Sequence, residues 1–181
     1  MTETTIMNSD ELENCIQRMA YEILEKYPED PVAFVGIYSR GVPFSDRLYE
    51  IVSEKNPNVR RGTLDITLYR DDLDNLGTIP SVKSSNLPFD VEGSRIVLLD
   101  DVLFTGRTVR AALDVLMDYG RPDRIELGVL IDRGHRELPI CPDYTGRTLE
   151  TTLADHINVR FTETDDRDGV FQVTDPGEEQ A

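Results

Sequence analysis

The stretch IVLLDDVLFTGRTVRAALDVL, residues 96–116, carries the signals that decide the fold. Residues 96–99 are continuously apolar and rich in β-formers, which is typical of a strand buried on both faces of a parallel sheet. From residue 109 to 119 apolar side chains recur at helical spacing, and those expected to face the core are Ala112, Leu113 and Leu116. A buried strand followed by an amphipathic helix predicts one unit of an α/β fold.

The polar turn within this stretch contains two carboxylates, Asp100 and Asp101, and then Thr105, Gly106, Arg107 and Thr108. In an open α/β sheet, ligands lie beyond the carboxyl ends of the strands, where the N–H groups of a helix N-terminus can bind a phosphate. The two hydroxyls, the glycine and the helix amides suit a phosphate monoester. The carboxylates would repel a phosphate, so we expect them to accept hydrogen bonds from ribose hydroxyls, directly or beside a bound Mg²⁺.

Each half of this turn also has a simpler explanation. A solvated acid pair at a strand end accounts for residues 100–101, and an ordinary helix start accounts for residues 105–108. The two halves in this order are far more specific than either alone. Neither G-x-x-x-x-G-K-[ST] nor G-x-G-x-x-G is present, so an NTPase loop or a dinucleotide fold is not indicated. A signalling receiver domain takes its acid pair from an early strand, whereas this pair lies past mid-chain.

Strand and helix signals alternate through the rest of the chain, which predicts a mostly parallel α/β sheet flanked by helices. A capping box at Asn8 and Glu11 predicts a helix that ends before Pro28, and Pro43 predicts the start of a second helix, closed by Pro57. Further strands are expected over residues 32–38, 62–68 and 125–131. Residues 70–91 predict a functional loop or a flexible hairpin, and the chain from residue 158 predicts a C-terminal β-hairpin. We expect a single domain over residues 1–181, with residues 170–181 partly frayed.

The composition excludes several classes of protein. No apolar run approaches the roughly 20 residues that cross a bilayer, and the N-terminus has no basic or apolar leader, so a soluble cytoplasmic protein is expected, with no membrane partner. Cys15 and Cys141 form neither a disulfide framework nor a zinc pattern. The net charge of −16 opposes the approach of any polyanion, so a nucleic-acid role would need a local basic patch.

Four segments carry a resemblance to a known family. VLLDDVLFTGRTV, residues 97–109, resembles the PRPP-binding motif of type I phosphoribosyltransferases. GIYSRGVPFSDRL, LDITLYRDDL and VLIDRGHRELPICPDYTGR are similar to the PyrR family, which are uracil phosphoribosyltransferases that also act as RNA-binding attenuators of pyrimidine genes. The likeness runs from about Leu12 to the C-terminal hairpin, and it implies the type I phosphoribosyltransferase fold.

The resemblance implies a function for many residues. The PRPP and UMP site would consist of Ser39, Arg40, Asp100, Asp101, Val102, Leu103, Phe104, Thr105, Gly106, Arg107 and Thr108. Ser39 and Arg40 would form the pyrophosphate loop, which in this fold class often contains a non-proline cis peptide, and Arg70 would begin a mobile loop that closes over PRPP. The catalytic residues implied are Arg40, Arg70, Asp100 and Asp101, and Asp132 and Arg133 would lie near the base. The simpler explanations are a surface arginine for Arg40 and a charged strand end for residues 69–73.

The reaction implied is attack of uracil on the anomeric carbon of PRPP, with release of pyrophosphate and formation of UMP. Mg²⁺ would bind through PRPP, with Asp100 or Asp101 as a possible ligand. No covalent nucleophile is required, so His135 and His156 are interpreted as solvated or structural. The family also implies a homo-oligomer, a dimer or a tetramer.

An RNA surface is the second implication of the resemblance. It would contain Arg18, Arg133, His135, Arg136 and Arg147 and would bind a pyrimidine-operon mRNA leader. This chain has Cys141 where the family usually has arginine, Tyr21 in place of histidine and Glu150 in place of proline, and each lost phosphate contact lowers nucleic-acid affinity. Four alternatives stay open: an enzyme that also binds RNA, an enzyme whose RNA binding is weakened, shifted or lost, a UMP sensor with little catalysis, and a purine-type transferase, against which LDITLYRDDL argues.

Overall fold

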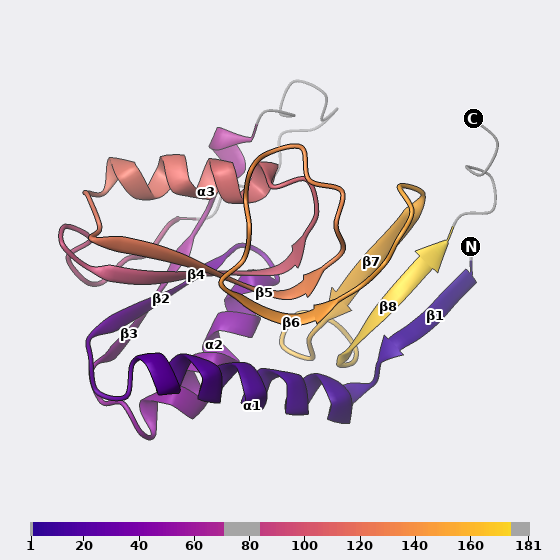
Figure 1. Ribbon diagram of the computed structural model, residues 1–181, viewed down its shortest axis with the longest axis horizontal. Coiled ribbons are helices and arrows are strands. Elements are labelled where there is room, and N and C mark those ends of the chain that lie inside the picture. Colours follow the sequence, from indigo (N-terminus) through magenta and orange to yellow (C-terminus); the bar gives the residue numbers. More distant parts are fainter. Residues whose placement is uncertain (1, 71–83, 175–181) are drawn as a thin grey trace.

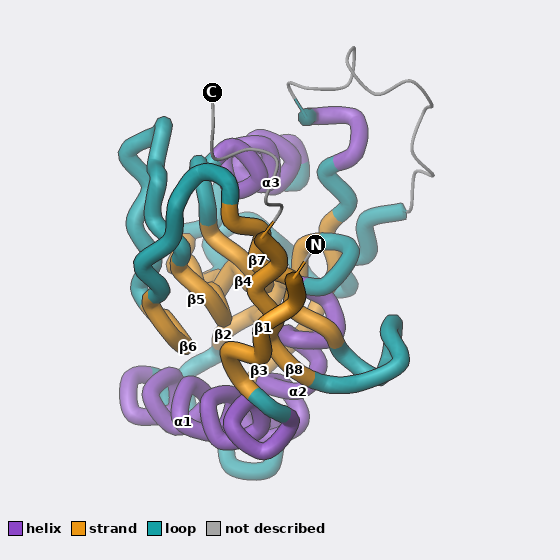
Figure 2. Tube along the Cα trace, turned by 90° about the vertical axis from the view of Figure 1, so that its right-hand side faces the viewer, coloured by secondary structure: helices purple, strands orange, loops and turns teal. Residues whose placement is uncertain are grey.

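The computed structural model describes residues 2–70 and 84–174, and its centre is a five-stranded parallel sheet. The order is β3-β2-β4-β5-β6, with β2 at Val32–Ile37, β3 at Val59–Leu64, β4 at Arg95–Leu103, β5 at Arg124–Asp132 and β6 at Tyr144–Thr148. Helices α1 (Ser9–Lys26) and α2 (Gly41–Ser53) cover one face, and α3 (Arg107–Asp118) covers the other (Figures 1 and 2). This three-layer arrangement confirms the predicted α/β fold.

Two apolar cores lie on the two faces of the sheet. On β4, Val97 and Leu99 belong to the core beneath α1 and α2, whereas Ile96 and Leu98 belong to the core beneath α3. Alternate side chains of a strand point to opposite faces, so a strand that is covered twice needs apolar residues at every position. Burial on both faces explains why the run at the start of residues 96–116 is continuously apolar.

A second, antiparallel sheet lies beside the first and has the order β1-β8-β7 (Figure 1). The hairpin of β7 (Asp155–Arg160) and β8 (Gly169–Thr174) confirms the C-terminal prediction, although β7 begins three residues before residue 158. Strand β1 (Thr2–Met7) pairs with β8 and was not predicted. The sheet thus joins the N-terminal segment to the end of the described chain.

Several predicted boundaries were wrong. The strand expected over residues 62–68 ends at Leu64, and Thr67–Tyr69 forms a short 3₁₀ turn, η1, which leaves the Leu68 side chain exposed. The cause is local, because the Asp65 carboxylate accepts hydrogen bonds from the backbone N–H and the hydroxyl of Thr67, a side-chain turn that competes with strand pairing. Helices α2 and α3 each begin two residues before the predicted starts, and β4 continues to Leu103, so the paired acids lie inside the strand.

The first helix agrees with its prediction in detail. The Asn8 side chain accepts from the N–H of Glu11, and the Glu11 carboxylate accepts from the N–H of Asn8, which forms the expected capping box. The predicted inner face is buried at Leu12, Ile16, Met19, Ile23 and Tyr27. Among residues 2–70 and 84–174, no helix has the length and apolar character that a membrane span needs. Most of the loop predicted over residues 70–91, and the end of the predicted tail, lie outside the described residues.

Candidate active site

A polar cavity of about 180 Å³ lies at the carboxyl ends of the parallel strands. Strand β2 leads into one side of it and β4 into the other, and these two strands are neighbours in the sheet. The cavity is lined by Tyr38, Ser39, Arg40, Ile66, Arg70, Asp100, Asp101, Val102 and Thr108. The structure therefore brings all four predicted catalytic residues together in one hollow, although Arg40 and Asp100 are 60 positions apart in sequence.

The paired acids form the buried side of the cavity. Asp100 is only 7% exposed, and its Oδ1 accepts a hydrogen bond from the N–H of Asp101 at 2.9 Å. Burial and the adjacent Asp101 raise the pKa of Asp100 well above its usual range. Burial also raises the pKa of Asp101, although a hydrogen bond with Asp100 and the charge of Arg40 act in the opposite direction. The pair of carboxyls therefore holds a proton to a higher pH than two solvated carboxyls would.

Arg40 faces the acids from the turn between β2 and α2. The Tyr38–Ser39 peptide just before it is cis, as the resemblance implied for this loop. The Arg40 guanidinium donates to both carboxylate oxygens of Asp165, from Nη2 at 2.8 Å and from Nε at 3.3 Å. These bonds, together with the charge of Asp101, raise the pKa of Arg40. Sequence reasoning missed Asp165, since nothing local connects a hairpin loop with a residue 125 positions earlier.

The N-terminus of α3 provides the phosphate end of the site. Gly106 is its N-cap with φ of 93°, a left-handed conformation that suits glycine. The N–H of Arg107 donates to the hydroxyl of Thr105 at 3.4 Å, whereas the next first-turn amides, those of Thr108 and Val109, can face an anion beside the cavity that Thr108 lines. Ile140 packs over Gly106, where an added Cβ would lie 3.3 Å from its Cδ1. A ribose-phosphate site at residues 100–108 stays a prediction, and these residues lie at the start of α3 and along the cavity.

Other predicted ligand residues lie around the cavity rather than in its lining. Leu103 is buried in the core, the Thr105 carbonyl accepts from two amides of the 137–138 segment, and Arg107 pairs with Glu137 at 2.7 Å. Phe104 lies beneath the Arg133 guanidinium, which is 4.0 Å from the ring centroid. These contacts hold the turn in its shape.

The two residues predicted near the base follow β5 and have structural partners. Asp132 accepts from Arg136 Nη2 at 2.6 Å and from the N–H of Gly134 at 3.0 Å. Arg133 is only 5% exposed and donates to the carbonyl of Thr152. Burial lowers the pKa of Arg133. Neither residue is among those that line the cavity.

The predicted RNA residues also bond to the protein itself. Arg18 donates to the carbonyls of Thr145 and Gly146, and Arg147 donates to the carbonyl of Ile6. Arg136 donates to the carbonyls of Phe104 and Ile140 as well as to Asp132. His135 is exposed, and its Nε2 lies 2.7 Å from the carbonyl oxygen of Thr151. These side chains join separate segments of the chain, which is a structural use of positive charge.

A metal ion would find two protein carboxylates at the cavity and little else. Within the described part of the chain, no group of three or more histidine, cysteine, aspartate or glutamate residues could hold a metal. Carboxylate oxygens are ligands that Mg²⁺ accepts, and this ion commonly binds through one or two carboxylates plus substrate phosphates. Asp100 and Asp101 fit an ion that arrives with a phosphorylated substrate and takes its remaining ligands from it.

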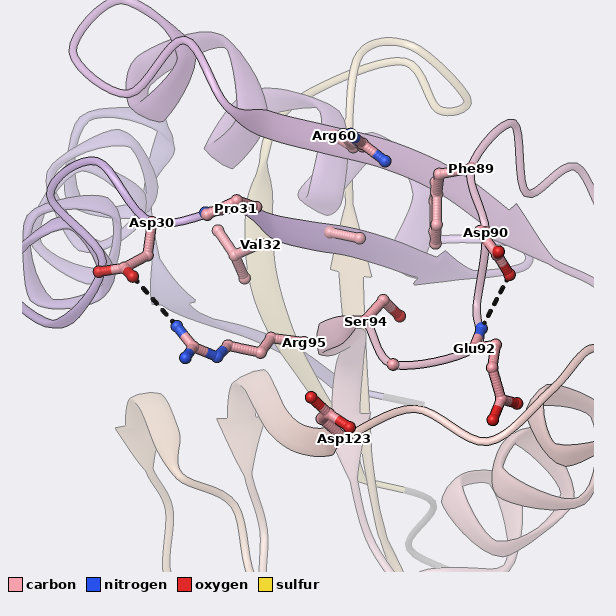
Figure 3. A pocket seen from close by; sticks show the side chains of 12 residues that line it. Asp30, Pro31, Val32, Arg60, Phe89, Asp90, Glu92, Ser94, Arg95 and Asp123 are labelled. Carbon is pink, nitrogen blue, oxygen red and sulfur yellow. Dashed lines mark hydrogen bonds and ion pairs between the residues drawn. The ribbon is translucent and has the colours of Figure 1, made fainter.

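A larger cavity, of about 400 Å³, lies at the opposite edge, where the parallel strands begin (Figure 3). It is lined by both cationic and acidic side chains, and Arg95 at its rim pairs with Asp30 at 3.2 Å. None of the residues predicted for the site lines this cavity. Ligands of open α/β sheets lie at the carboxyl ends of the strands, so the smaller cavity is the candidate active site despite its size.

Comparisons with known proteins identify the family. Residues 4–166 match the model of the phosphoribosyl transferase domain family. The chain is 47% identical over 176 residues to the "Bifunctional protein PyrR" of Deinococcus radiodurans, covering 96% of both chains. It is 49% identical over 170 residues to the protein of the same name from Chloroflexus aurantiacus, covering 93% of both.

Solved structures agree on the fold. The hypoxanthine-guanine phosphoribosyltransferase of Bacillus anthracis superposes with a TM-score of 0.73 at 15% identity, covering 94% of this chain and 98% of that one. The hypoxanthine phosphoribosyltransferase of Trypanosoma cruzi gives a TM-score of 0.73 at 18% identity, covering 95% of each chain. At such identities the likeness shows the fold alone. The chain therefore belongs to the phosphoribosyl transferase domain family and, within it, to the PyrR family, as the four sequence segments predicted.

Proposed function

We propose that this PyrR-type phosphoribosyltransferase converts uracil and PRPP into UMP and pyrophosphate. The observation that carries the proposal is the cavity in which Arg40, Arg70 and the acid pair meet the N-terminus of α3. A cationic side, an acidic side and a helix N-terminus correspond to the pyrophosphate, the ribose hydroxyls and the 5′-phosphate of PRPP. The LDITLYRDDL segment, residues 64–73, favours the pyrimidine over a purine base.

In the proposed reaction, the bond between the anomeric carbon and pyrophosphate breaks while a bond to N1 of uracil forms, and the N1 proton is released to solvent. The transition state carries positive charge on the ribose and growing negative charge on pyrophosphate. Arg40 and Arg70 stabilise the leaving group, and the buried carboxylates accept from the ribose hydroxyls. The α3 amides and Thr108 fix the 5′-phosphate, so that much of the catalysis is positioning. Mg²⁺ bound with PRPP would neutralise pyrophosphate, and Asp100 and Asp101 are the residues that would hold it.

A base panel with matched variants tests the enzymatic proposal. Arg40→Ala and Asp101→Asn should each lower UMP formation at least about 100-fold, since each removes charge facing the reacting groups. Arg61→Ala and Asp46→Asn are the matched controls, because these two residues form an exposed ion pair with each other at 3.1 Å, away from the cavity. Wild-type protein without turnover on any common base would refute the enzyme and leave the UMP sensor.

We also propose that the chain is a UMP-responsive attenuator that binds a pyrimidine-operon leader RNA, with an affinity weakened or shifted relative to its family. Arg18, His135 and Arg147 are the exposed members of the predicted surface, whereas Arg133 is buried. Tyr21, Cys141 and Glu150 are exposed and add no positive charge. Filter binding over a salt series, with and without UMP, tests this. Tight, UMP-stimulated binding would show that these three residues matter little, and no binding at low salt would refute the regulatory role.

The cellular setting completes the proposal. We propose a cytoplasmic homo-oligomer, a dimer or tetramer, whose ligands are PRPP, uracil, UMP and Mg²⁺. Light scattering coupled to gel filtration distinguishes the two assemblies, and a monomeric mass would contradict both.

A further inference from the structure

Asp165 connects the antiparallel sheet to the candidate active site. It lies in the loop between β7 and β8, and its side chain is only 15% exposed, although the partner Arg40 side chain is 40% exposed. Besides its two bonds from Arg40, its Oδ2 accepts from the N–H of Phe161 at 3.1 Å and from the hydroxyl of Thr164 at 2.9 Å. The carboxylate is therefore fixed by its own loop before it meets the arginine.

The loop itself is attached to α2 by a second arginine. Arg47 pairs with Glu163 and with Asp168 and donates to the hydroxyl of Thr162, and its guanidinium lies 5.0 Å from the centre of the Phe161 ring. Arg40 immediately precedes α2 and Arg47 lies within it. Two arginines at the start of α2 and within it thus bind the same loop. Each of them fixes the position of Asp165 relative to the start of this helix.

The pair leaves Arg40 able to bind an anion. A guanidinium has five N–H donors in a rigid plane, and Asp165 uses one on Nε and one on Nη2, which leaves the remaining donors directed elsewhere. A bidentate bond to a fixed carboxylate restricts the plane of the guanidinium as well as its position. Hydrogen bonds from Arg40, Phe161 and Thr164 lower the pKa of Asp165 to about 2, so the carboxylate is charged at any pH at which the protein would be assayed.

We infer that Asp165 is a positioning residue, which holds the Arg40 guanidinium in the orientation that receives the pyrophosphate of PRPP. The inference rests on the proposed function and adds to it a residue from the other sheet. Orientation and charge make opposite predictions here. If Asp165 only neutralised Arg40, its removal would free positive charge and tighten pyrophosphate binding. If it orients Arg40, its removal should weaken binding, because the arginine must then be ordered by the ligand itself.

The test compares Asp165→Asn with Glu163→Gln. Both variants remove one negative charge from the same loop, but Glu163 bonds Arg47 and not Arg40. We expect Asp165→Asn to raise the KM for PRPP and the Kd for Mg²⁺-pyrophosphate, measured by calorimetry, roughly tenfold, equal to about 1.4 kcal/mol. Glu163→Gln should stay within about twofold, and the KM for uracil should change little in either variant. Asp165→Glu, which keeps the charge, should recover part of the loss.

A double-mutant cycle separates this role from a general loosening of the loop. In an Arg40→Ala background, Asp165→Asn should change pyrophosphate affinity less than about twofold, because its effect passes through Arg40. Three results would overturn the inference. Asp165→Asn could change pyrophosphate affinity equally in both backgrounds, it could leave that affinity unchanged or raise it when made alone, or Glu163→Gln could lower the affinity by the same factor. If Asp165→Asn does not fold, Asp165→Glu takes its place and must alter PRPP KM without altering uracil KM. If Arg40→Ala alone leaves pyrophosphate affinity unchanged, the proposed function of Arg40 fails first.

Discussion

Replacing Gly41 with alanine should damage the site although no charged residue is replaced. Gly41 is the first residue of α2, and a Cβ built on it would lie 2.6 Å from the carbonyl oxygen of Leu99 and 3.2 Å from Cα of Asp100. Both atoms are backbone, so no side chain can rotate away. To reach the 3.4 Å of ordinary contact, α2 and β4 must separate by about 0.8 Å. That movement carries Arg40, which precedes α2, away from the acid pair.

The magnitude follows from two opposing effects. Overpacking of this kind costs about 1 to 3 kcal/mol, whereas alanine is about 1 kcal/mol better than glycine in a helix, so a net loss of up to about 2 kcal/mol in the free energy of unfolding is expected. Activity should fall much further, because a misplacement near 1 Å can cost on the order of 100-fold. Urea unfolding and PRPP-dependent UMP formation measure the two effects.

Gly93→Ala is the control for Gly41→Ala. An added Cβ at Gly93 meets nothing within 4 Å, but its φ of 69° makes alanine strained. We expect a similar loss of stability, about 1 kcal/mol, with the kinetic constants of the wild type. A Gly41→Ala variant whose kcat/KM for PRPP matched that of Gly93→Ala would refute the argument that the close approach of α2 to β4 sets the distance between Arg40 and the acids.

Three further predictions concern buried charge. Asp100→Asn should raise the free energy of unfolding by on the order of 1 to 2 kcal/mol at pH 8, and the gain should shrink toward pH 4. The reason is that the raised pKa makes the folded wild type hold a proton that the unfolded chain releases above its usual pKa. Unfolding measured at several pH values checks the gain, and UMP formation should be lost. Glu126→Gln should cost about 2 kcal/mol, because the 1% exposed carboxylate binds Lys26, Tyr27 and Tyr144. These partners lower the Glu126 pKa despite its burial, so its contribution is full above pH 4.5 and is lost as the pH falls through the folded value. Urea unfolding at pH 7 and pH 3 should therefore show a smaller cost at pH 3. Arg133→Ala should destabilise by about 2 to 3 kcal/mol in urea, well above the exposed Arg147→Ala, because its guanidinium lies on Phe104 inside the protein; equal costs would contradict its structural role.

The parts of the fold that were predictable are those whose residues are determined by local burial. The apolar run in β4 and the one-sided pattern of α1 are properties of consecutive residues, and both were predicted. Strands β1 and β6 were missed because their sequences, TETTIM and YTGRT, are largely polar. Each of these is a strand because a neighbour pairs with it, β8 in one case and β5 in the other.

The site divides in the same way. Residues 100–108 are contiguous, so they could be interpreted from the sequence as one motif. That Arg40 and Arg70 lie beside this motif was implied only by the family resemblance. The partner of Arg40 could not be predicted, because no sequence motif marks Asp165 and only the folding of the second sheet brings it to the arginine. The bonds that occupy Arg18 and Arg147 were hidden for the same reason, because their acceptors are backbone carbonyls of distant segments.

The most direct test of the central claim is a PRPP-dependent assay of purified protein with Mg²⁺ and a panel of bases, following both pyrophosphate release and the nucleotide formed. The structure and the family predict stoichiometric UMP and pyrophosphate with uracil, and little or no product with hypoxanthine, guanine or adenine. Product from a purine base without UMP from uracil, or no product from any base, would contradict the account.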